Sequence, residues 1–117
     1  MSKYQKTSVA DQPRVELHEA LALTGAEISI NKMPAGAAVP FVHSHKQNEE
    51  IYGVLSGHGT MTLDGEAVEL SAGDWLRVAP EVKRQLSAAA DSEISYICIQ
   101  VKAGSLEQMT AGDAVIG

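Results

Sequence analysis

The sequence predicts an all-β domain, a sandwich or barrel of the jelly-roll kind built from about eight short strands. Three observations lead to this prediction. Short apolar runs recur along the chain from Ala26 onward, glycines and prolines fall mostly between these runs, and no stretch after residue 26 keeps a helical period for three turns. Short strands separated by turn residues at such spacing are typical of sandwiches and barrels.

The first 25 residues are expected to form an arm outside the barrel. Residues 1–13 have no regular apolar pattern, and residues 15–23 fit a short helical turn or an edge strand equally poorly, so both remain open. The barrel is predicted over residues 26–102. Its expected strands occupy residues 26–33, 38–45, 50–56, 60–63, 67–70, 75–78, 85–88 and 94–102.

Turn chemistry supports this division of the barrel into strands. Asp64-Gly65 separates two short apolar runs, and an Asp-Gly pair between such runs is a strong hairpin signal. The tail, residues 103–117, is polar and rich in small residues. We expect it to pack on the barrel or on a partner chain.

Length, composition and charge narrow the class of protein. A chain of 117 residues fits one domain with its own core. Its 44% hydrophobic residues exclude a disordered chain, and its single cysteine excludes an intrachain disulfide framework. A net charge of −6 and 4% aromatic residues argue against a nucleic-acid partner.

The localisation expected from the sequence is cytoplasmic, with no membrane partner. The N-terminal residues contain no apolar stretch of signal-peptide length. The longest apolar-rich run, residues 94–101, is far shorter than the roughly 18–20 residues that span a bilayer. Cys98 lies in this run and is expected to be a small core hydrophobe.

The most informative segment runs from Gly36 to Gly57. His43 and His45 are two residues apart, so on a strand both imidazoles would point to one face, about 6.5 Å apart. A turn then leads to Glu49 and Glu50, of which alternation lets only one face inward. Two imidazoles and a carboxylate on neighbouring strands form the ligand set of a facial metal site with open positions.

These residues carry a resemblance to the cupin family. The segment resembles the first cupin motif, a glycine, His-x-His, four residues, Glu, six residues and a glycine, here Gly36, His43, His45, Glu50 and Gly57. The resemblance favours Glu50 over Glu49. It implies a jelly-roll barrel with a divalent transition metal, Zn, Mn, Fe or Ni, inside its mouth.

A second cupin motif follows with departures. Gly73, Asp74 and Pro80 match it, but the strand between Asp74 and Pro80 is one residue longer than usual. Counted from Pro80, the family's fourth ligand, a histidine, is replaced by Gln85. Gln85 then either ligates through its amide oxygen, holds a metal-bound water, or leaves a weak or empty metal site. A one-residue slip would turn it to the opposite face.

Other residues near the motifs have both a structural and a functional interpretation. Phe41 and Tyr52 share parity with His43 and Glu50, so they are candidate pocket walls, and Tyr52 is equally a candidate core aromatic. The pair Lys83-Arg84 is expected to be solvated in a turn, and a rim role toward an anionic ligand is the alternative. His58 is expected at the surface, and Trp75 in the core or at a subunit interface.

Two functions follow from this pattern. The first is a metal-dependent protein that acts on or binds a small anionic organic molecule; two neutral histidines, Gln85 and one carboxylate would leave a divalent ion with net charge +1. Whether it is an enzyme stays open, and dioxygenases, decarboxylases and isomerases share the fold implied by the resemblance. The alternative is a non-catalytic ligand-binding module with weak or no metal.

Strands that are apolar on both faces predict a homodimer.

Overall fold

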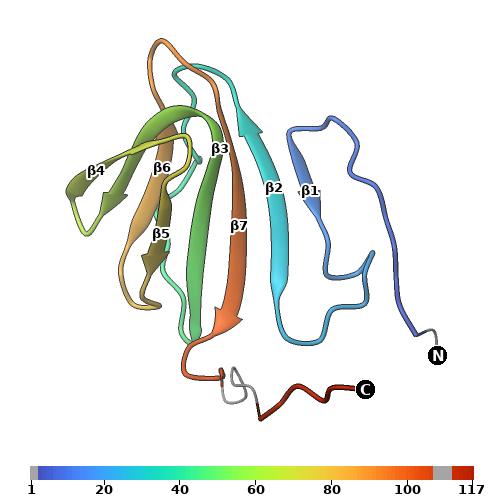
Figure 1. Ribbon diagram of the computed structural model, residues 1–117. Helices are drawn as coiled ribbons and strands as arrows, with labels where there is room; N and C mark the ends of the chain where they lie inside the picture. The colour runs from blue at the N-terminus through green and yellow to red at the C-terminus, as the bar shows by residue number, and fades with distance from the viewer. Residues whose placement is uncertain (1–2, 107–111) are drawn as a thin grey trace.

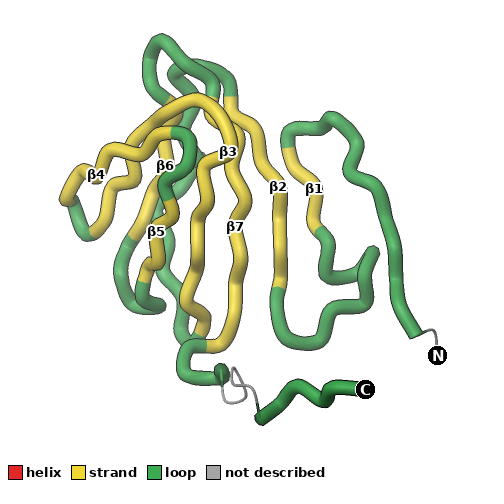
Figure 2. The backbone as a smooth tube through the Cα atoms, viewed as in Figure 1, coloured by secondary structure: helices red, strands yellow, loops and turns green. Residues whose placement is uncertain are grey.

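β-Strands make up the regular secondary structure of the described residues in this computed structural model (Figure 2). The structure describes residues 3–106 and 112–117. In chain order the strands are β1 (Arg14–Glu16), β2 (Glu27–Met33), β3 (Asn48–Leu63), β4 (Glu66–Ser71), β5 (Trp75–Val78), β6 (Arg84–Ala88) and β7 (Ile94–Lys102). The all-β prediction is confirmed.

The strands pair antiparallel into two sheets that share one long strand. The first sheet has the order β1-β2-β7-β3-β5, and the second places β4 and β6 on either side of the later half of β3. Figure 1 shows β3 rising beside β7 and then bending over toward β4 and β6. The strand therefore closes one edge of the barrel by passing from one sheet to the other.

The bend in β3 joins two strands that the sequence predicted separately, residues 50–56 and 60–63. The register with β7 shifts between Val54 and Ser56, and Gly57 adopts a φ of 76°. A bulge followed by a left-handed glycine turns a strand sharply without ending it. Because a Cβ at Gly57 would lie 1.8 Å from the backbone oxygen of Glu93, the bend brings two backbones into close contact.

The predicted strand 38–45 is wrong as a continuous strand. This segment pairs with β6 only through two isolated bridges, Ala38 with Ser87 and His43 with Arg84. Pro40 has no backbone N–H to donate, which interrupts the ladder between the two bridges. The segment lies along β6 as an irregular edge that carries both histidines.

Residues 15–23 contain both of the features that the sequence left open, part of an edge strand and a helical turn. β1 is a short edge strand paired with β2, so residues 14–16 belong to the sheet although we predicted an arm. A single helical turn follows, in which the Leu21 N–H donates to the Leu17 carbonyl at 2.9 Å. In Figure 1 this turn and residues 3–13 lie beyond β1.

The predicted hairpin at Asp64-Gly65 is confirmed. It joins β3 to β4, and both residues have positive φ, 48° and 86°. Two left-handed residues match the primed turn that the twist of paired strands favours.

The core lies between the two sheets. It is formed by apolar side chains that point inward from β3, β4, β5, β6 and β7: Tyr52, Val54, Met61, Leu70, Val78, Leu86, Ala88, Ile94, Tyr96 and Cys98. Met61 and Ile94 are fully buried. Cys98 is buried, as expected.

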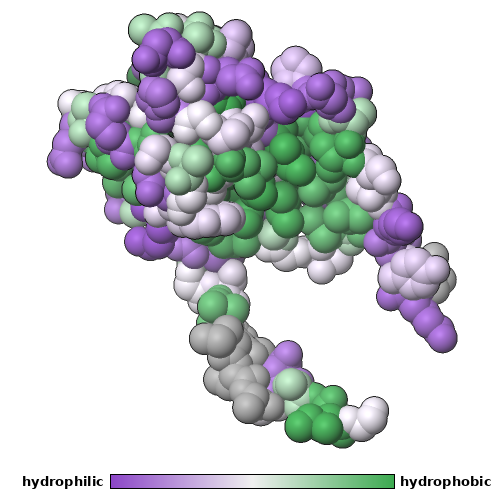
Figure 3. All heavy atoms as spheres, turned by 45° about the horizontal axis from the view of Figure 1, so that its top comes forward, coloured by the Kyte–Doolittle hydropathy of each residue, from purple (hydrophilic) through white to green (hydrophobic). Residues whose placement is uncertain are grey.

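Outside the core, the visible face in Figure 3 carries a continuous hydrophobic area bordered by hydrophilic residues. Leu106, Val115 and Ile116 of the tail are almost fully exposed. Residues 107–111 of the tail lie outside the described residues. Within the described part of the chain, no helix has the length and apolar character needed to cross a bilayer.

Candidate metal centre

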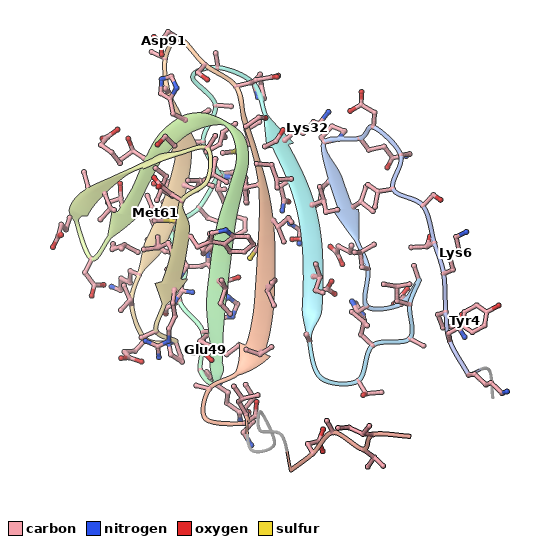
Figure 4. All side chains as sticks on the ribbon, in the orientation of Figure 1. Tyr4, Lys6, Lys32, Glu49, Met61 and Asp91 are labelled. Atoms are coloured by element: carbon pink, nitrogen blue, oxygen red, sulfur yellow. The ribbon has the colours of Figure 1, made fainter. Side chains whose placement is uncertain are left out.

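Glu50 is the centre of the site, and strand geometry aims it inward. It lies on β3, in register with Gln100 of β7 and Val78 of β5, and it is 3% exposed. Its neighbour Glu49 points to the opposite face and pairs with the exposed Arg77 at 2.6 Å. Figure 4 labels Glu49 near the start of β3. The inward-facing carboxylate is therefore Glu50, as the resemblance favoured.

His43 and His45 reach Glu50 from the irregular segment beside β6. Backbone bonds hold this segment: the His43 N–H donates to the Arg84 carbonyl at 3.2 Å, and the His45 N–H to the Pro80 carbonyl at 2.7 Å. The two rings lie 5.0 Å apart, nearly perpendicular. Their Nε2 atoms lie 3.6 and 3.4 Å from Oε1 and Oε2 of Glu50. The structure thus brings together the three residues that the spacing singled out.

The two oxygens of Glu50 have different surroundings. Oε1 accepts hydrogen bonds from the Tyr52 hydroxyl at 2.6 Å and from Arg84 Nη1 at 2.8 Å. Oε2 accepts only a weak bond from the Cys98 thiol at 3.4 Å among the described residues. Since a carboxylate oxygen offers about two lone pairs, Oε1 is saturated and Oε2 keeps capacity for another partner.

Arg84 corrects the expectation that Lys83-Arg84 is a solvated pair. Arg84 is 1% exposed, and its ion pair with Glu50 lies inside the barrel. Its Nη2 donates to the carbonyls of Ala79, Pro80 and Val82 at 2.8–2.9 Å. The guanidinium therefore compensates the buried charge of Glu50 and ties the turn before β6 to the site.

The charges around the carboxylate set its ionisation. Burial favours its neutral form, but hydrogen bonds from Tyr52 and Arg84 outweigh burial and lower the pKa of Glu50. Burial lowers the pKa of His43 despite the attraction of Glu50. At neutral pH the site therefore presents an ionised carboxylate and a neutral His43 imidazole, which are the protonation states that a metal ion requires.

Two neighbours of Glu50 keep their protons. Burial, with the nearby carboxylate adding to it, raises the pKa of Cys98 to about 12. Burial also raises the pKa of Tyr52 far above its ordinary value. Both groups therefore donate hydrogen bonds to Glu50 at neutral pH, and neither is available as a base.

Gln85 takes a place that the sequence did not specify. Its side chain lines the same cavity as the histidines, and its Nε2 donates to the Val39 carbonyl at 2.7 Å. This bond joins the 38–45 segment to β6 at a point between its two isolated bridges. A ligand role for Gln85 stays a prediction.

A cavity of about 670 Å³ opens from this site. Phe41 forms part of its wall, 59% exposed, with its ring 5.6 Å from that of His43. Tyr52 lines it as well, so the pocket and core interpretations of Tyr52 both hold. The far wall comes from β1 and β2, where the Arg14 guanidinium donates to Oδ1 of Asn31 at 2.7 Å.

The donor set fits a divalent metal ion. One ligand atom from each of His43, His45 and Glu50 can be chosen so that all lie within 4.8 Å of one another. Buried Nδ1 of His43 and Nε2 of His45 have no hydrogen-bond partner among the described residues. Buried polar atoms are normally paired, and an ion held between these side chains would give such nitrogens a partner.

Comparison with known proteins identifies the fold family. The family model described as Cupin domain matches residues 30–100, which is more than half of the chain. The chain belongs to the cupin family. A crystal structure of a cupin protein from Bacteroides fragilis is 69% identical, with a TM-score of 0.96, and covers 100% of this chain and 99% of that one.

Two further matches are more distant. An uncharacterized protein of Methanocaldococcus jannaschii is 32% identical over 66 residues, 56% of this chain; the match spans 52% of that relative, about half its length. A putative sugar phosphate isomerase from Acidithiobacillus ferrooxidans is 24% identical, with a TM-score of 0.67, over 76% of this chain and 59% of that one. At that identity the second likeness concerns the fold alone.

The cupin motifs also explain how Arg84 was missed. If the extra residue between Gly73 and Pro80 is discounted, the family's histidine position falls on Arg84 rather than on Gln85. Counting from Gly73 would have given this alignment. The alternation of β6 agrees with it, because Arg84 and Leu86 are buried while Gln85 is half-buried.

Proposed function

We propose that this cupin binds a divalent transition metal through His43, His45 and Glu50 and holds a small anionic organic molecule in the adjoining cavity. One observation carries the proposal: His45 Nε2, buried and without a hydrogen-bond partner among the described residues, lies 3.4 Å from Oε2, the Glu50 oxygen that keeps capacity for another partner. A bound ion would act there as a Lewis acid toward the ligand. Zn, Mn, Fe and Ni all accept this nitrogen and oxygen donor set.

The charge balance supports an anionic ligand. Because Arg84 cancels the charge of Glu50 and His43 is neutral, a divalent ion would leave this centre with a net charge near +2. A buried positive site of this kind favours carboxylates, phosphates or enolates over neutral molecules.

The class of reaction, if there is one, is a separate proposal. Dioxygenase, decarboxylase and isomerase activities all suit a Lewis-acid site of this kind. Tyr52 and Cys98 retain their protons at neutral pH and so would serve as donors. With His43 and His45 assigned to the ion, no separate general base faces Glu50 among its described contacts.

A second candidate function has its own supporting observation. Arg84, Tyr52 and Cys98 already satisfy Glu50 without a metal, so the fold does not need an ion to stabilise the buried carboxylate. The same cavity would then serve a non-catalytic module that binds a small anion beside His43 and His45. Such a module would act as a sensor or as an accessory protein.

Titration calorimetry distinguishes the two functions. Metal-free protein is titrated with Zn²⁺, Mn²⁺ and Ni²⁺, and then with small carboxylates and phosphates in the presence and absence of metal. The first function predicts one metal-binding event that His45→Ala removes, and anion binding that depends on the metal at that centre. Anion binding of equal strength without metal would favour the second function.

We also propose that a second copy of the chain covers the outer face of the first sheet. Ile28, Ile99 and Ile51 follow one another in register across β2, β7 and β3 on this face. In the next row the Trp75 ring, 60% exposed, lies against Gly53. A twofold-symmetric dimer would cover this face on both copies, because each copy contributes the same surface to the interface. Light scattering at micromolar concentration should give the dimer mass, and a monomer would contradict the proposal.

A further inference from the structure

We propose that Glu16, His18 and Glu27 form a second divalent-cation site, at the edge of the sheet where β1 meets β2. The expected ion is of the zinc class, which accepts one imidazole nitrogen together with carboxylate oxygens. The sequence alone gave His18 no partner. The site is separate from the His43, His45 and Glu50 centre in its residues, strands and ligand set.

Strand register builds this cluster. Glu16 of β1 pairs with Ser29 of β2, and the Leu17 N–H donates to the Ile28 carbonyl at 2.9 Å. The next cross-strand position therefore places His18 opposite Glu27. Directly opposed residues of antiparallel strands share a face, so Glu16, His18 and Glu27 all project on the side of the buried Ser29.

The same register sets the distance between the two centres. Glu27 is paired with Gln100, and Gln100 is paired with Glu50, so the three lie in one row across β2, β7 and β3. Two strand spacings separate the Cα atoms of Glu27 and Glu50 by about 10 Å. Glu27 also lines the cavity that opens from the first centre. The second site therefore lies at the rim of that cavity.

Two buried atoms of this cluster have spare capacity to bind a cation. Nδ1 of His18 and Oε1 of Glu27 are buried and have no hydrogen-bond partner within the described part of the chain. His18 Nδ1 lies against Glu27 Oε2, but without the geometry of a hydrogen bond. One donor atom from each of the three residues lies within 4.8 Å of the others. A cation bound between these atoms would give each of them a partner.

The surrounding charges favour a cation. Two carboxylates face the site, and Arg14 compensates one of them through its Nε, 3.1 Å from Oε1 of Glu16. The carboxylate of Glu19 lies 3.9 Å from His18 Nε2 and is exposed. Lys102 lines the small hollow beside Glu27 but forms no ion pair among the described contacts. The two carboxylates outnumber Arg14, the one cation paired within the cluster.

A bound ion would fasten the edge of the sheet. β1 is three residues long and pairs with β2 alone, so few backbone hydrogen bonds hold it. An ion shared by Glu16, His18 and Glu27 would tie β1 and the helical turn after it to β2. Zinc bound in this way stabilises the folded chain because the unfolded chain has no preformed site.

The test is Zn²⁺ titration in a variant that lacks the first centre. His43→Ala/His45→Ala should still bind one Zn²⁺ per chain, and Zn²⁺ should still raise its melting temperature. Adding His18→Ala should weaken this binding at least tenfold. Glu27→Gln, which keeps the side-chain shape, should weaken it as well. Adding His58→Ala instead is the matched control, because His58 is exposed and pairs with Asp91 away from both centres.

The outcomes separate this site from the first one. No Zn²⁺ binding by the His43→Ala/His45→Ala variant with a wild-type circular dichroism spectrum would overturn the second site and leave the proposed function intact. Binding unchanged by both His18→Ala and Glu27→Gln would also overturn it. Loss of one ion from wild-type protein by His18→Ala alone, with the other retained, would support it even if the first centre proved to bind anions without metal.

Discussion

Replacing Arg84 with methionine tests the balance of charge inside the barrel. The substitution removes the guanidinium that donates to Glu50 Oε1 at 2.8 Å and leaves an ionised carboxylate that is 3% exposed. It also removes the donor to the carbonyls of Ala79, Pro80 and Val82. Breaking a buried pair by removing one partner costs about 3–5 kcal/mol of the free energy of unfolding. We expect a loss in that range for Arg84→Met.

The chain offers a matched control for this variant. Arg77 pairs with Glu49 at 2.6 Å on the outer face, with 62% of its side chain exposed. An exposed pair contributes about 0–1 kcal/mol, so Arg77→Met should lower the free energy of unfolding by no more than that. Urea denaturation followed by circular dichroism measures both variants. Equal losses of under 1 kcal/mol for Arg84→Met and Arg77→Met would refute the buried ion pair.

Metal provides a second measurement on the same variant. Without Arg84, a divalent ion at Glu50 would compensate the orphaned carboxylate. Saturating Zn²⁺ should therefore raise the melting temperature of Arg84→Met more than that of the wild type. An equal or smaller rise would mean that the ion does not contact Glu50.

Three further predictions concern the site and its frame. Gly57→Ala should lower the free energy of unfolding by about 2–5 kcal/mol, because it combines a φ of 76° with a backbone clash. Gly36→Ala, with a φ of 78° and open space, should lower it by about 1–2 kcal/mol, and thermal unfolding compares the two variants. Gln85→Ala should lower the free energy of unfolding by about 1 kcal/mol, because it loses the hydrogen bond to the Val39 carbonyl. A tenfold lower Zn²⁺ affinity of this variant in calorimetry would instead show that Gln85 is a ligand. Because the pKa of Glu50 is lowered by folding, its ionised form stabilises the protein above the unfolded value of 4.5, and this stability is lost as the pH falls through the folded pKa. Acid titration followed by fluorescence should therefore show a shallower loss below pH 4.5 for Glu50→Gln than for the wild type.

Much of the fold was predictable because its signals are local. Turn residues and short apolar runs determine where strands start and end, and Asp64-Gly65 specified its hairpin correctly. The histidine and glutamate spacing singled out three residues that the structure brings together, because they lie on one segment of the chain that folds back on itself. These features require no knowledge of distant contacts.

The errors arose where distant contacts decide the outcome. The bulge near Val54 and the left-handed Gly57 let one strand serve two sheets, which periodicity alone reads as two strands. Arg84 resembled a solvated residue because its partner, Glu50, lies 34 positions away in the chain. His18 had no predicted partner because the pairing of β1 with β2 places Glu27 opposite it.

The central claim is that His43, His45 and Glu50 hold a divalent ion, and Zn²⁺ calorimetry on metal-free His45→Ala tests it most directly. Nε2 of His45 is buried without a hydrogen-bond partner, so its removal should leave the fold intact. We predict that His45→Ala loses one binding event that the wild type and His58→Ala both show. Wild-type stoichiometry and affinity in a folded His45→Ala would contradict the metal centre.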